Sequence, residues 1–322
     1  MDINGSVFAA MLTPMNDQGD VAPENVGVLV DHILSRGVHG LYASGSTGES
    51  VLQSREERAA VLTALADHAA GKTTLIAHVG AASTREAVAL AELAGEKGYD
   101  AVSAVPPYYY KHRYEDIVAY YKAIADASGL PLIIYNIPAL SGTDLSTDKL
   151  LELMEDPRIS GVKYTAQDLF QFGELKKAAP EKKLYFGTDE MFIGAAAAGA
   201  DGGIGSTYNL IGDIYLAVEA AIAAGDVDRA RRAQRIANDF IAILLRAGVV
   251  PGLKHCLNQL GVPVGSVRAP FTPVSVEAAK ELDAWMASVN LSLDRGAAAV
   301  LPYGFLDFWH RFWPPLSQFR CL

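Results

Sequence analysis

The sequence has very few cysteines and no cluster of basic residues. Its two cysteines, Cys256 and Cys321, are too few for a disulfide framework or a cysteine-based metal site. The formal net charge is -10, and the lysine and arginine residues are scattered along the chain. Nucleic acids and anionic membranes are therefore poor candidate partners.

Long apolar runs are also missing. No charge-free stretch approaches the roughly 18 residues that a membrane-spanning helix needs. The first residues, Met1 to Ser6, contain neither a basic segment nor the apolar core of a signal peptide. We therefore expect a cytoplasmic protein with no membrane partner.

Hydrophobic residues make up 50% of the 322 residues, which is enough for a large core. Short apolar runs rich in β-branched residues alternate with alanine-rich amphipathic segments. The predicted strands are residues 7–12, 40–43, 74–79, 101–105, 132–135, 161–163, 184–186 and 202–204. Parallel strands need a return segment of helical length. The pattern therefore predicts an α/β fold, and the number of strands favours a TIM (β/α)8 barrel over a doubly wound sheet.

Several helix boundaries have local signals. Ser54 to Glu57 and Ser83 to Glu86 both have the form of a capping box, which predicts two helix starts. Gly71, Gly98 and Gly129 are predicted to mark helix ends.

The chain divides into three expected parts. Residues 1–210 are predicted to form the barrel, and residues 211–292 a set of C-terminal helices that complete and extend it. Residues 293–322 form an aromatic-rich, proline-interrupted tail. This tail is either a docking segment or a disordered or artificial end, and we favour the second interpretation.

Lys163 and Tyr135 are the strongest candidates for catalysis. Each ends a predicted buried strand, and the two strands are consecutive. Burial disfavours the charged form of a lysine, so its neutral amine becomes available for attack on a ketone. A tyrosine at the same end of the neighbouring strand can move the proton that carbon–carbon cleavage requires. A strand-end lysine considered alone usually reaches solvent, and a tyrosine considered alone is usually a packed aromatic with a satisfied hydroxyl. The hypothesis therefore depends on the pair.

Other polar residues follow the predicted strands, where barrel active sites form. The segment from Gly45 to Glu49 offers hydroxyl and backbone N–H groups that suit a carboxylate or phosphate, although an ordinary glycine turn is as consistent with it. Asp189 and Glu190 fit better as acceptors for a polyhydroxylated substrate than as a metal site. His78 is interpreted as a satisfied core or rim residue, and Glu49 as a helix-start acid with no part in the chemistry.

Five segments resemble one family in order and spacing. They are Gly-Ser-Thr-Gly-Glu (45–49), Tyr-Asn-Ile-Pro-Ala-Leu-Ser-Gly (135–142), Gly-Val-Lys-Tyr-Thr (161–165), Asp-Glu (189–190) and Gly-Gly-Ile-Gly-Ser-Thr-Tyr-Asn (202–209). Over residues 5–292 the chain resembles the class I aldolase superfamily that contains N-acetylneuraminate lyase and dihydrodipicolinate synthase. The likeness is greatest to the sialic acid branch.

The resemblance implies a role for each matched residue. Lys163 would form a Schiff base with the substrate ketone and Tyr135 would transfer the proton, without a metal or organic cofactor. Ser46 and Thr47 would hold the pyruvyl carboxylate. The residues that would contact the sugar are Thr165, Gly187, Asp189, Glu190 and Ser206. Tyr109 would reach toward a neighbouring subunit, which implies a homotetramer.

Within the superfamily, position 140 separates the branches. The synthase branch typically has an arginine after Tyr-Asn-x-Pro for a second carboxylate, whereas this chain has Leu140. The resemblance therefore implies reversible cleavage of N-acetylneuraminate to N-acetylmannosamine and pyruvate. An aldolase for a 2-keto-3-deoxy sugar acid, a dihydrodipicolinate synthase and a catalytically silent barrel that binds a keto acid remain open as alternatives. Tyr164 is expected to face away from the site, because successive strand residues alternate faces.

Overall fold

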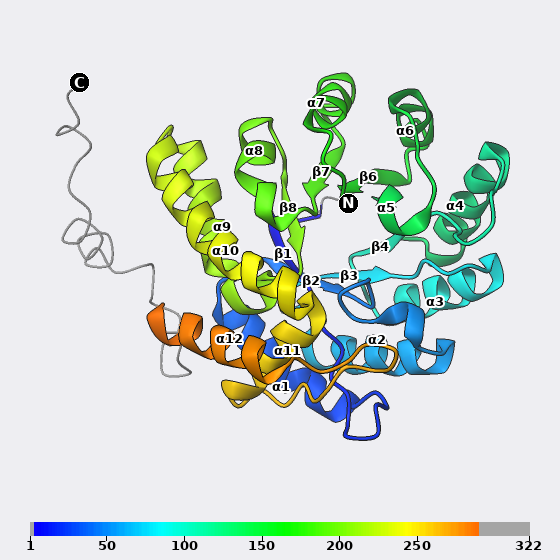
Figure 1. Ribbon diagram of the computed structural model, residues 1–322. Coiled ribbons are helices and arrows are strands. Elements are labelled where there is room, and N and C mark those ends of the chain that lie inside the picture. The colour runs from blue at the N-terminus through cyan, green and yellow to red at the C-terminus, as the bar shows by residue number, and fades with distance from the viewer. Residues whose placement is uncertain (1–2, 290–322) are drawn as a thin grey trace, which may run out of the picture.

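The computed structural model describes residues 3–289 and shows a closed barrel of eight parallel strands in sequence order (Figure 1). The strands are β1 Val7–Ala10, β2 Gly40–Ala43, β3 Thr74–His78, β4 Ala101–Ala104, β5 Leu132–Asn136, β6 Ile159–Tyr164, β7 Lys183–Phe186 and β8 Gly202–Gly205. Strand β1 pairs with both β2 and β8, which closes the barrel. The predicted fold class and all eight predicted strands are confirmed.

A ring of helices surrounds the strands (Figure 1). These helices are α1 Val26–Ser35, α2 Arg55–Ala69, α3 Thr84–Glu96, α4 Tyr114–Ser128, α5 Pro138–Ser141, α6 Thr147–Met154, α7 Leu169–Ala178, α8 Phe192–Ala197 and α9 Tyr208–Ala223. Each connection between consecutive strands contains at least one of them, so each strand reaches the next by a crossover that contains a helix.

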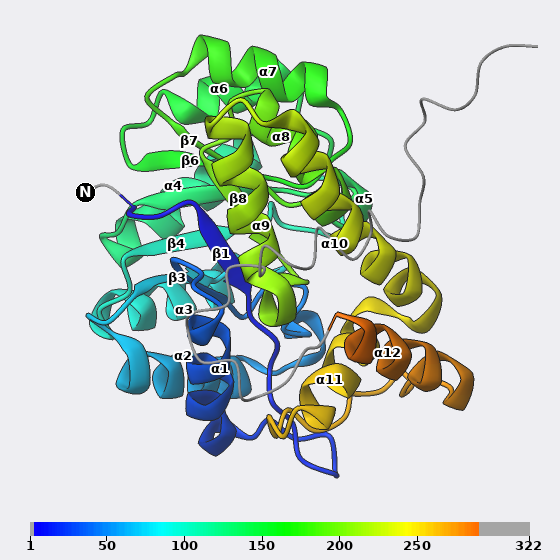
Figure 2. The same ribbon diagram turned by 90° about the vertical axis from the view of Figure 1, so that its left-hand side faces the viewer.

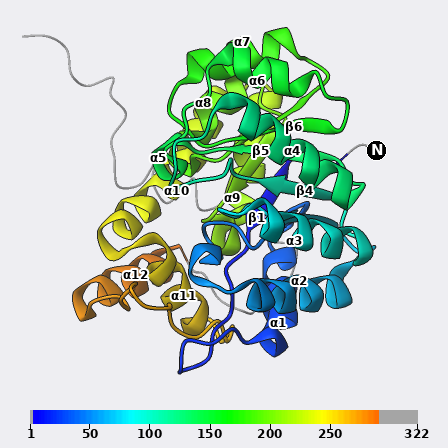
Figure 3. The same cartoon turned by 90° about the vertical axis from the view of Figure 1, so that its right-hand side faces the viewer.

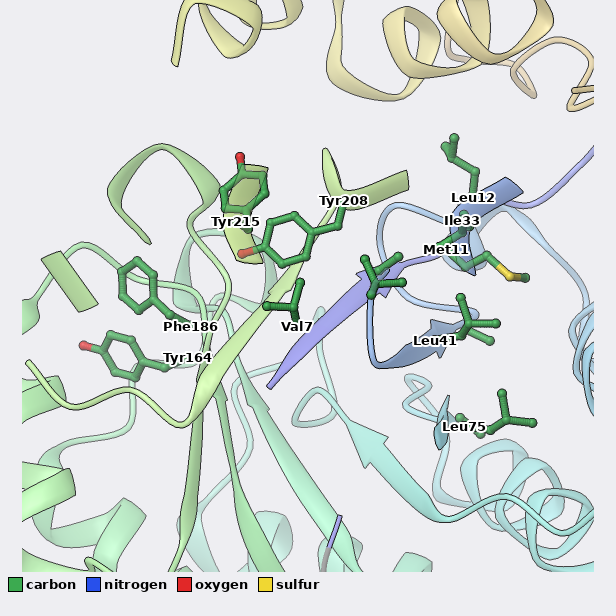
Figure 4. Packing of buried hydrophobic residues seen from close by; sticks show 14 of the residues in the cluster. Val7, Met11, Leu12, Ile33, Leu41, Leu75, Tyr164, Phe186, Tyr208 and Tyr215 are labelled. Carbon is green, nitrogen blue, oxygen red and sulfur yellow. The ribbon is translucent and has the colours of Figure 1, made fainter. Parts of the chain in front are cut away.

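Alternation along the strands divides the core in two. In β5, Ile133 and Tyr135 belong to the cluster inside the barrel, whereas Leu132 and Ile134 belong to the layer between strands and helices. Figure 4 shows part of the outer layer, in which Tyr164 of β6 and Phe186 of β7 stack with their ring centroids 6.4 Å apart. The outward orientation predicted for Tyr164 is confirmed.

The predicted helix starts differ in their capping. Ser54 accepts a hydrogen bond from the N–H of Glu57 and Glu57 bonds back to Ser54, so this capping box is complete. Ser83 precedes α3, but its side chain accepts no capping bond, so the second predicted capping box is wrong. The spacing of serine and glutamate does not fix the serine rotamer, which decides whether the bond forms. Gly129 caps α4 in the left-handed conformation, as expected.

The C-terminal helices lie beyond the carboxyl ends of the strands. They are α10 Val227–Ala247, α11 Val249–Gln259 and α12 Val276–Ser288. Figures 2 and 3 show α10, α11 and α12 on the side of the barrel toward which the strands run. The predicted helical extension is confirmed, whereas the predicted tail at 293–322 lies outside the described residues. Among residues 3–289, no single helix is long and apolar enough to cross a membrane. Helices α10 and α11 meet these criteria only as a pair, and that pair is bent by 113°.

Candidate active site

Lys163 is buried inside the barrel near the carboxyl end of β6. It lies between Tyr135 of β5 and Tyr185 of β7 in the strand register, and only 3% of its surface is exposed. Its Nζ lies 4.0 Å from the ring centroid of Tyr135 and 4.2 Å from that of Tyr42. The predicted pairing of Lys163 with Tyr135 across adjacent strands is thus present in the fold.

Burial changes the acidity of this lysine. Desolvation lowers the pKa of Lys163 below its ordinary value, while Tyr135 and the Asp189 carboxylate oppose that shift. A lowered pKa increases the fraction of neutral amine near neutral pH. The neutral amine is the form that attacks a carbonyl carbon.

Tyr42 and His78 complete the surroundings of Tyr135. The rings of Tyr42 and His78 meet Tyr135 edge to face, with centroids 6.0 Å and 5.8 Å away. His78 has one ring nitrogen 2.8 Å from the carbonyl oxygen of Ser44, and its other ring nitrogen accepts the N–H of Val105. Desolvation lowers the pKa of His78 well below its usual value, so this ring is neutral. The interpretation of His78 as a satisfied buried residue agrees with these bonds.

The loop after β2 meets the loop after β8. Thr47 Oγ1 and Ser206 Oγ are 2.7 Å apart, and Ser46 is half-buried beside them in the chain. The main chain of the 45–49 loop turns tightly, because Gly48 N–H donates to the Gly45 carbonyl. Thr13 Oγ1 donates to the Gly48 carbonyl and ties the turn to the segment that follows β1. Hydroxyl and N–H groups of the predicted carboxylate-binding loop therefore lie at the carboxyl end of the barrel.

Asp189 is buried at the start of the short turn after β7, Asp189–Met191. Its Oδ2 accepts hydrogen bonds from the N–H and the hydroxyl of Thr207, at 2.9 Å and 2.7 Å. Burial raises the pKa of Asp189 to about 6, against the effect of the Thr207 bonds and of Lys163. Glu190, the next residue, is half-buried.

Two further predicted residues lie next to Lys163. A Cβ built on Gly187 would lie 2.0 Å from Thr165 Oγ1 and 3.3 Å from Lys163 Cε. Thr165 Oγ1 is itself buried and has no hydrogen-bond partner among the described residues. A buried hydroxyl without a partner is costly, so a substrate oxygen that bonded it would be stabilised.

Tyr109 is separate from this group. It is 87% exposed, has a positive φ of 79°, and packs edge to face on Tyr110, which is 72% exposed. Within residues 3–289, the structure records no hydrogen bond or ring contact between Tyr109 and a residue of the candidate site. Its expected cross-subunit role stays a prediction.

Some residues of the site were missed in the sequence. Tyr42 lies inside a strand rather than at its end, although it has the inward-facing parity of an interior residue. Glu49 is buried and ion-paired with Lys254, with 2.7 Å between Nζ and Oε1. The sequence feature that could have identified Lys254 as a buried residue is its place between Val250 and Leu257 on the apolar face of α11.

In residues 3–289, no group of three or more His, Cys, Asp or Glu side chains is arranged to hold a metal ion.

The sequence matches a known protein family over most of its length. Residues 4–288 match the dihydrodipicolinate synthetase family. The N-acetylneuraminate lyase of Enterobacter sp. (strain 638) is 46% identical over 282 residues, which cover 86% of this chain and 94% of that protein.

Two solved structures have the same fold. The N-acetylneuraminate lyase from Fusobacterium nucleatum complexed with pyruvate has a TM-score of 0.83 and 33% identity, covering 88% of this chain and 96% of that chain. The dihydrodipicolinate synthase DapA-2 from Bacillus anthracis has a TM-score of 0.85 and 29% identity, covering 90% and 99%. The backbone is therefore common to both branches, while sequence identity is higher to the lyases. The family match spans nearly all of the described residues, and the chain belongs to the dihydrodipicolinate synthetase family.

Proposed function

We propose that the protein is a Schiff-base aldolase that reversibly cleaves N-acetylneuraminate to N-acetylmannosamine and pyruvate. The observation that carries the proposal is the buried amine of Lys163 against the ring of Tyr135. The 46% identity to an N-acetylneuraminate lyase supports this substrate. Leu140, which is 70% exposed on α5, has no charge to hold the second carboxylate that a synthase product carries.

The reaction starts at the amine. Lys163 Nζ attacks C2 of the open-chain substrate and water leaves, which gives an iminium ion. Ser46 and Thr47 hold the adjacent carboxylate with hydroxyl and backbone N–H groups. Because the iminium accepts electrons, the reaction needs no metal or organic cofactor.

Cleavage then requires proton transfer. Tyr135 takes the proton of the C4 hydroxyl and passes its own proton to the substrate carboxylate as the C3–C4 bond breaks, and the bonding electrons move into the iminium to form an enamine. The proton on the carboxyl group is then available for C3 of the enamine. The aldose, N-acetylmannosamine, leaves. Protonation of the enamine at C3 and hydrolysis by water release pyruvate and restore the amine. Thr165, Gly187, Asp189, Glu190 and Ser206 surround the sugar portion in this scheme.

The assembly and compartment belong to the same proposal. Tyr109 and Tyr110 form an exposed aromatic pair, which suits a contact with another subunit of a homotetramer. A net charge of -10 suits a protein of the cytoplasm that acts on small molecules rather than on nucleic acid.

The direct test is pyruvate release from N-acetylneuraminate by the purified protein. We expect release from this substrate and not from a 2-keto-3-deoxy sugar acid without the acetamido group. Consumption of pyruvate with aspartate semialdehyde would identify a synthase instead. Release of pyruvate from the shorter sugar acid alone would retain the aldolase and change its substrate.

Gly187→Ala gives a prediction for the surroundings of the amine. The added methyl group would force the Thr165 side chain to turn and would press on the lysine stem. We expect about a tenfold loss of kcat, because small displacements of reacting groups are costly. Gly173→Ala is the control, since a Cβ there meets nothing within 4 Å. Equal kcat values for the two variants would contradict the close approach at Gly187.

A further inference from the structure

Two helices of the C-terminal extension bind the two loops that are proposed to hold the carboxylate and the sugar portion of the substrate. Helix α10 contacts the turn that carries Asp189 and Glu190, and α11 contacts the loop that ends in Glu49. In Figure 2, α10 and α11 lie on the side of the barrel toward which the strands run. The two sets of contacts share no residue.

The α10 contacts are made by two side-chain amides one helical turn apart. Gln234 donates from Nε2 to the Asp189 carbonyl at 3.0 Å, and Asn238 donates from Nδ2 to the Glu190 carbonyl at 3.1 Å. Gln234 also donates to Asn238 Oδ1 at 2.9 Å, so the two amides form one unit. Since both amides bind the main chain, they fix the direction of the turn without using either carboxylate.

Burial and hydrogen bonds restrict the side chain of Gln234. It is only 4% exposed, and its Oε1 accepts the N–H of Ile193 at 3.0 Å. A buried amide with its donor and acceptor groups satisfied holds one orientation. The turn 189–190 is therefore held from behind by a fixed group on a long helix.

The α11 contact is a buried ion pair. Lys254 Nζ lies 2.7 Å from Glu49 Oε1 and donates to the Ser266 carbonyl at 2.7 Å. The other carboxylate oxygen of Glu49 accepts the backbone N–H of Arg268 at 2.9 Å. The two side chains are 2% and 0% exposed, so no water replaces either partner.

Glu49 also has an unusual backbone conformation. Glu49 has a φ of 58°, in the left-handed region that a residue with a side chain rarely adopts. Such a conformation persists only where surrounding contacts enforce it. Glu49 follows directly on Ser46, Thr47 and Gly48, so its ion pair fixes the end of the loop proposed to bind the pyruvyl carboxylate.

We propose that the extension positions the two halves of the substrate independently. In this proposal Gln234 and Asn238 position the sugar-binding turn, and Lys254 with Glu49 positions the carboxylate-binding loop. All four are positioning residues, and the inference rests on the proposed function. Its consequence is that damage to one set of contacts weakens the binding of one half of the substrate only.

The test uses two variants and two readouts. Asn238→Leu keeps the branched shape and the number of side-chain heavy atoms at a half-buried position. It removes the bond to the Glu190 carbonyl and the bond accepted from Gln234. The double variant Glu49→Gln with Lys254→Met removes both charges together, because removing one would leave an unpaired buried charge. The readouts are KM for cleavage of N-acetylneuraminate and the pyruvate concentration that gives half-maximal borohydride inactivation, which measures imine formation without the sugar.

We expect Asn238→Leu to raise KM for the sugar substrate about five- to tenfold, because the turn loses its one hydrogen bond to this side chain, with pyruvate half-saturation unchanged. The double variant should raise pyruvate half-saturation by a similar factor. Asp239→Leu, at the exposed neighbouring position of α10, is the control and should change neither value. A purely structural role would lower the unfolding temperature of the variants and leave both constants of the folded enzyme unchanged, which would overturn the proposal. The double variant should raise both constants, because N-acetylneuraminate carries the same carboxylate as pyruvate. Equal shifts of both constants in Asn238→Leu, or an unchanged pyruvate half-saturation in the double variant, would overturn the independence of the two halves.

Failure of the proposed function gives a different result. Wild-type protein that forms the pyruvate imine but does not cleave N-acetylneuraminate would contradict the proposed substrate. The sugar readout is then taken with the keto sugar acid that the wild type does cleave. The same separation of the two constants is expected there.

Discussion

Lys163→Ala abolishes cleavage of N-acetylneuraminate in the proposed mechanism, because no other group supplies the amine that forms the iminium. We expect a fall in kcat of at least about 10⁴-fold, the order of magnitude seen when a covalent nucleophile is removed. Borohydride treatment in the presence of pyruvate should no longer attach a pyruvyl group to the protein. Both results are measured on the same purified variant, by pyruvate release and by intact mass.

The controls separate loss of the amine from loss of the fold. Lys177→Ala removes a lysine whose side chain is 79% exposed, and it should leave kcat and labelling unchanged. The thermal unfolding of Lys163→Ala should remain cooperative, since removing a buried amine also removes its desolvation cost. Cleavage by Lys163→Ala near the wild-type rate would refute the Schiff-base assignment.

Tyr135→Phe should separate imine formation from bond cleavage. The ring of Tyr135 packs on Lys163 and against Tyr42, and phenylalanine retains both contacts while losing the hydroxyl. Pyruvate should therefore still form an imine that borohydride traps. Cleavage should fall by about 10²- to 10⁴-fold, the usual effect of removing a general acid–base group.

Tyr42→Phe is the matched control for this variant. The Tyr42 ring lies at nearly the same distance from Lys163 Nζ as the Tyr135 ring, but its hydroxyl donates to Ser103 Oγ at 3.0 Å. We expect a smaller loss of kcat than in Tyr135→Phe, because this hydroxyl is already bonded within the barrel. A larger loss in Tyr42→Phe would move the proton-transfer role to Tyr42.

The predictable part of the site follows from local patterns. Strand ends and alternation are short-range properties, so the sequence predicts that Lys163 and Tyr135 lie side by side, as the register of β5 and β6 confirms. Tyr164 faces outward for the same reason. The parallel order of strands also predicts that loops after β2, β7 and β8 meet at one end of the barrel.

The unpredicted part depends on long-range contacts. Glu49 was interpreted as an ordinary helix-start acid, because nothing near it in the sequence identifies Lys254 as its partner. In the sequence, Gln234 and Asn238 look like residues of an ordinary polar helix face. Only the position of α10 in the fold shows that they bind the turn after β7. Pairing across the fold is set by the packing of whole helices, which a periodic pattern does not encode.

The filled interior of the barrel has a kinetic consequence. Phe8 and Tyr185 meet edge to face inside the barrel, and neither side chain is exposed. These rings belong to a buried apolar cluster inside the barrel, so we expect water to reach Lys163 from the carboxyl end of the strands. Under the proposed reaction, the water that hydrolyses the pyruvyl imine must pass through the space that the aldose has vacated. Product departure is then ordered, with the aldose first and pyruvate last, and a high concentration of aldose returns the enamine to substrate before hydrolysis can occur.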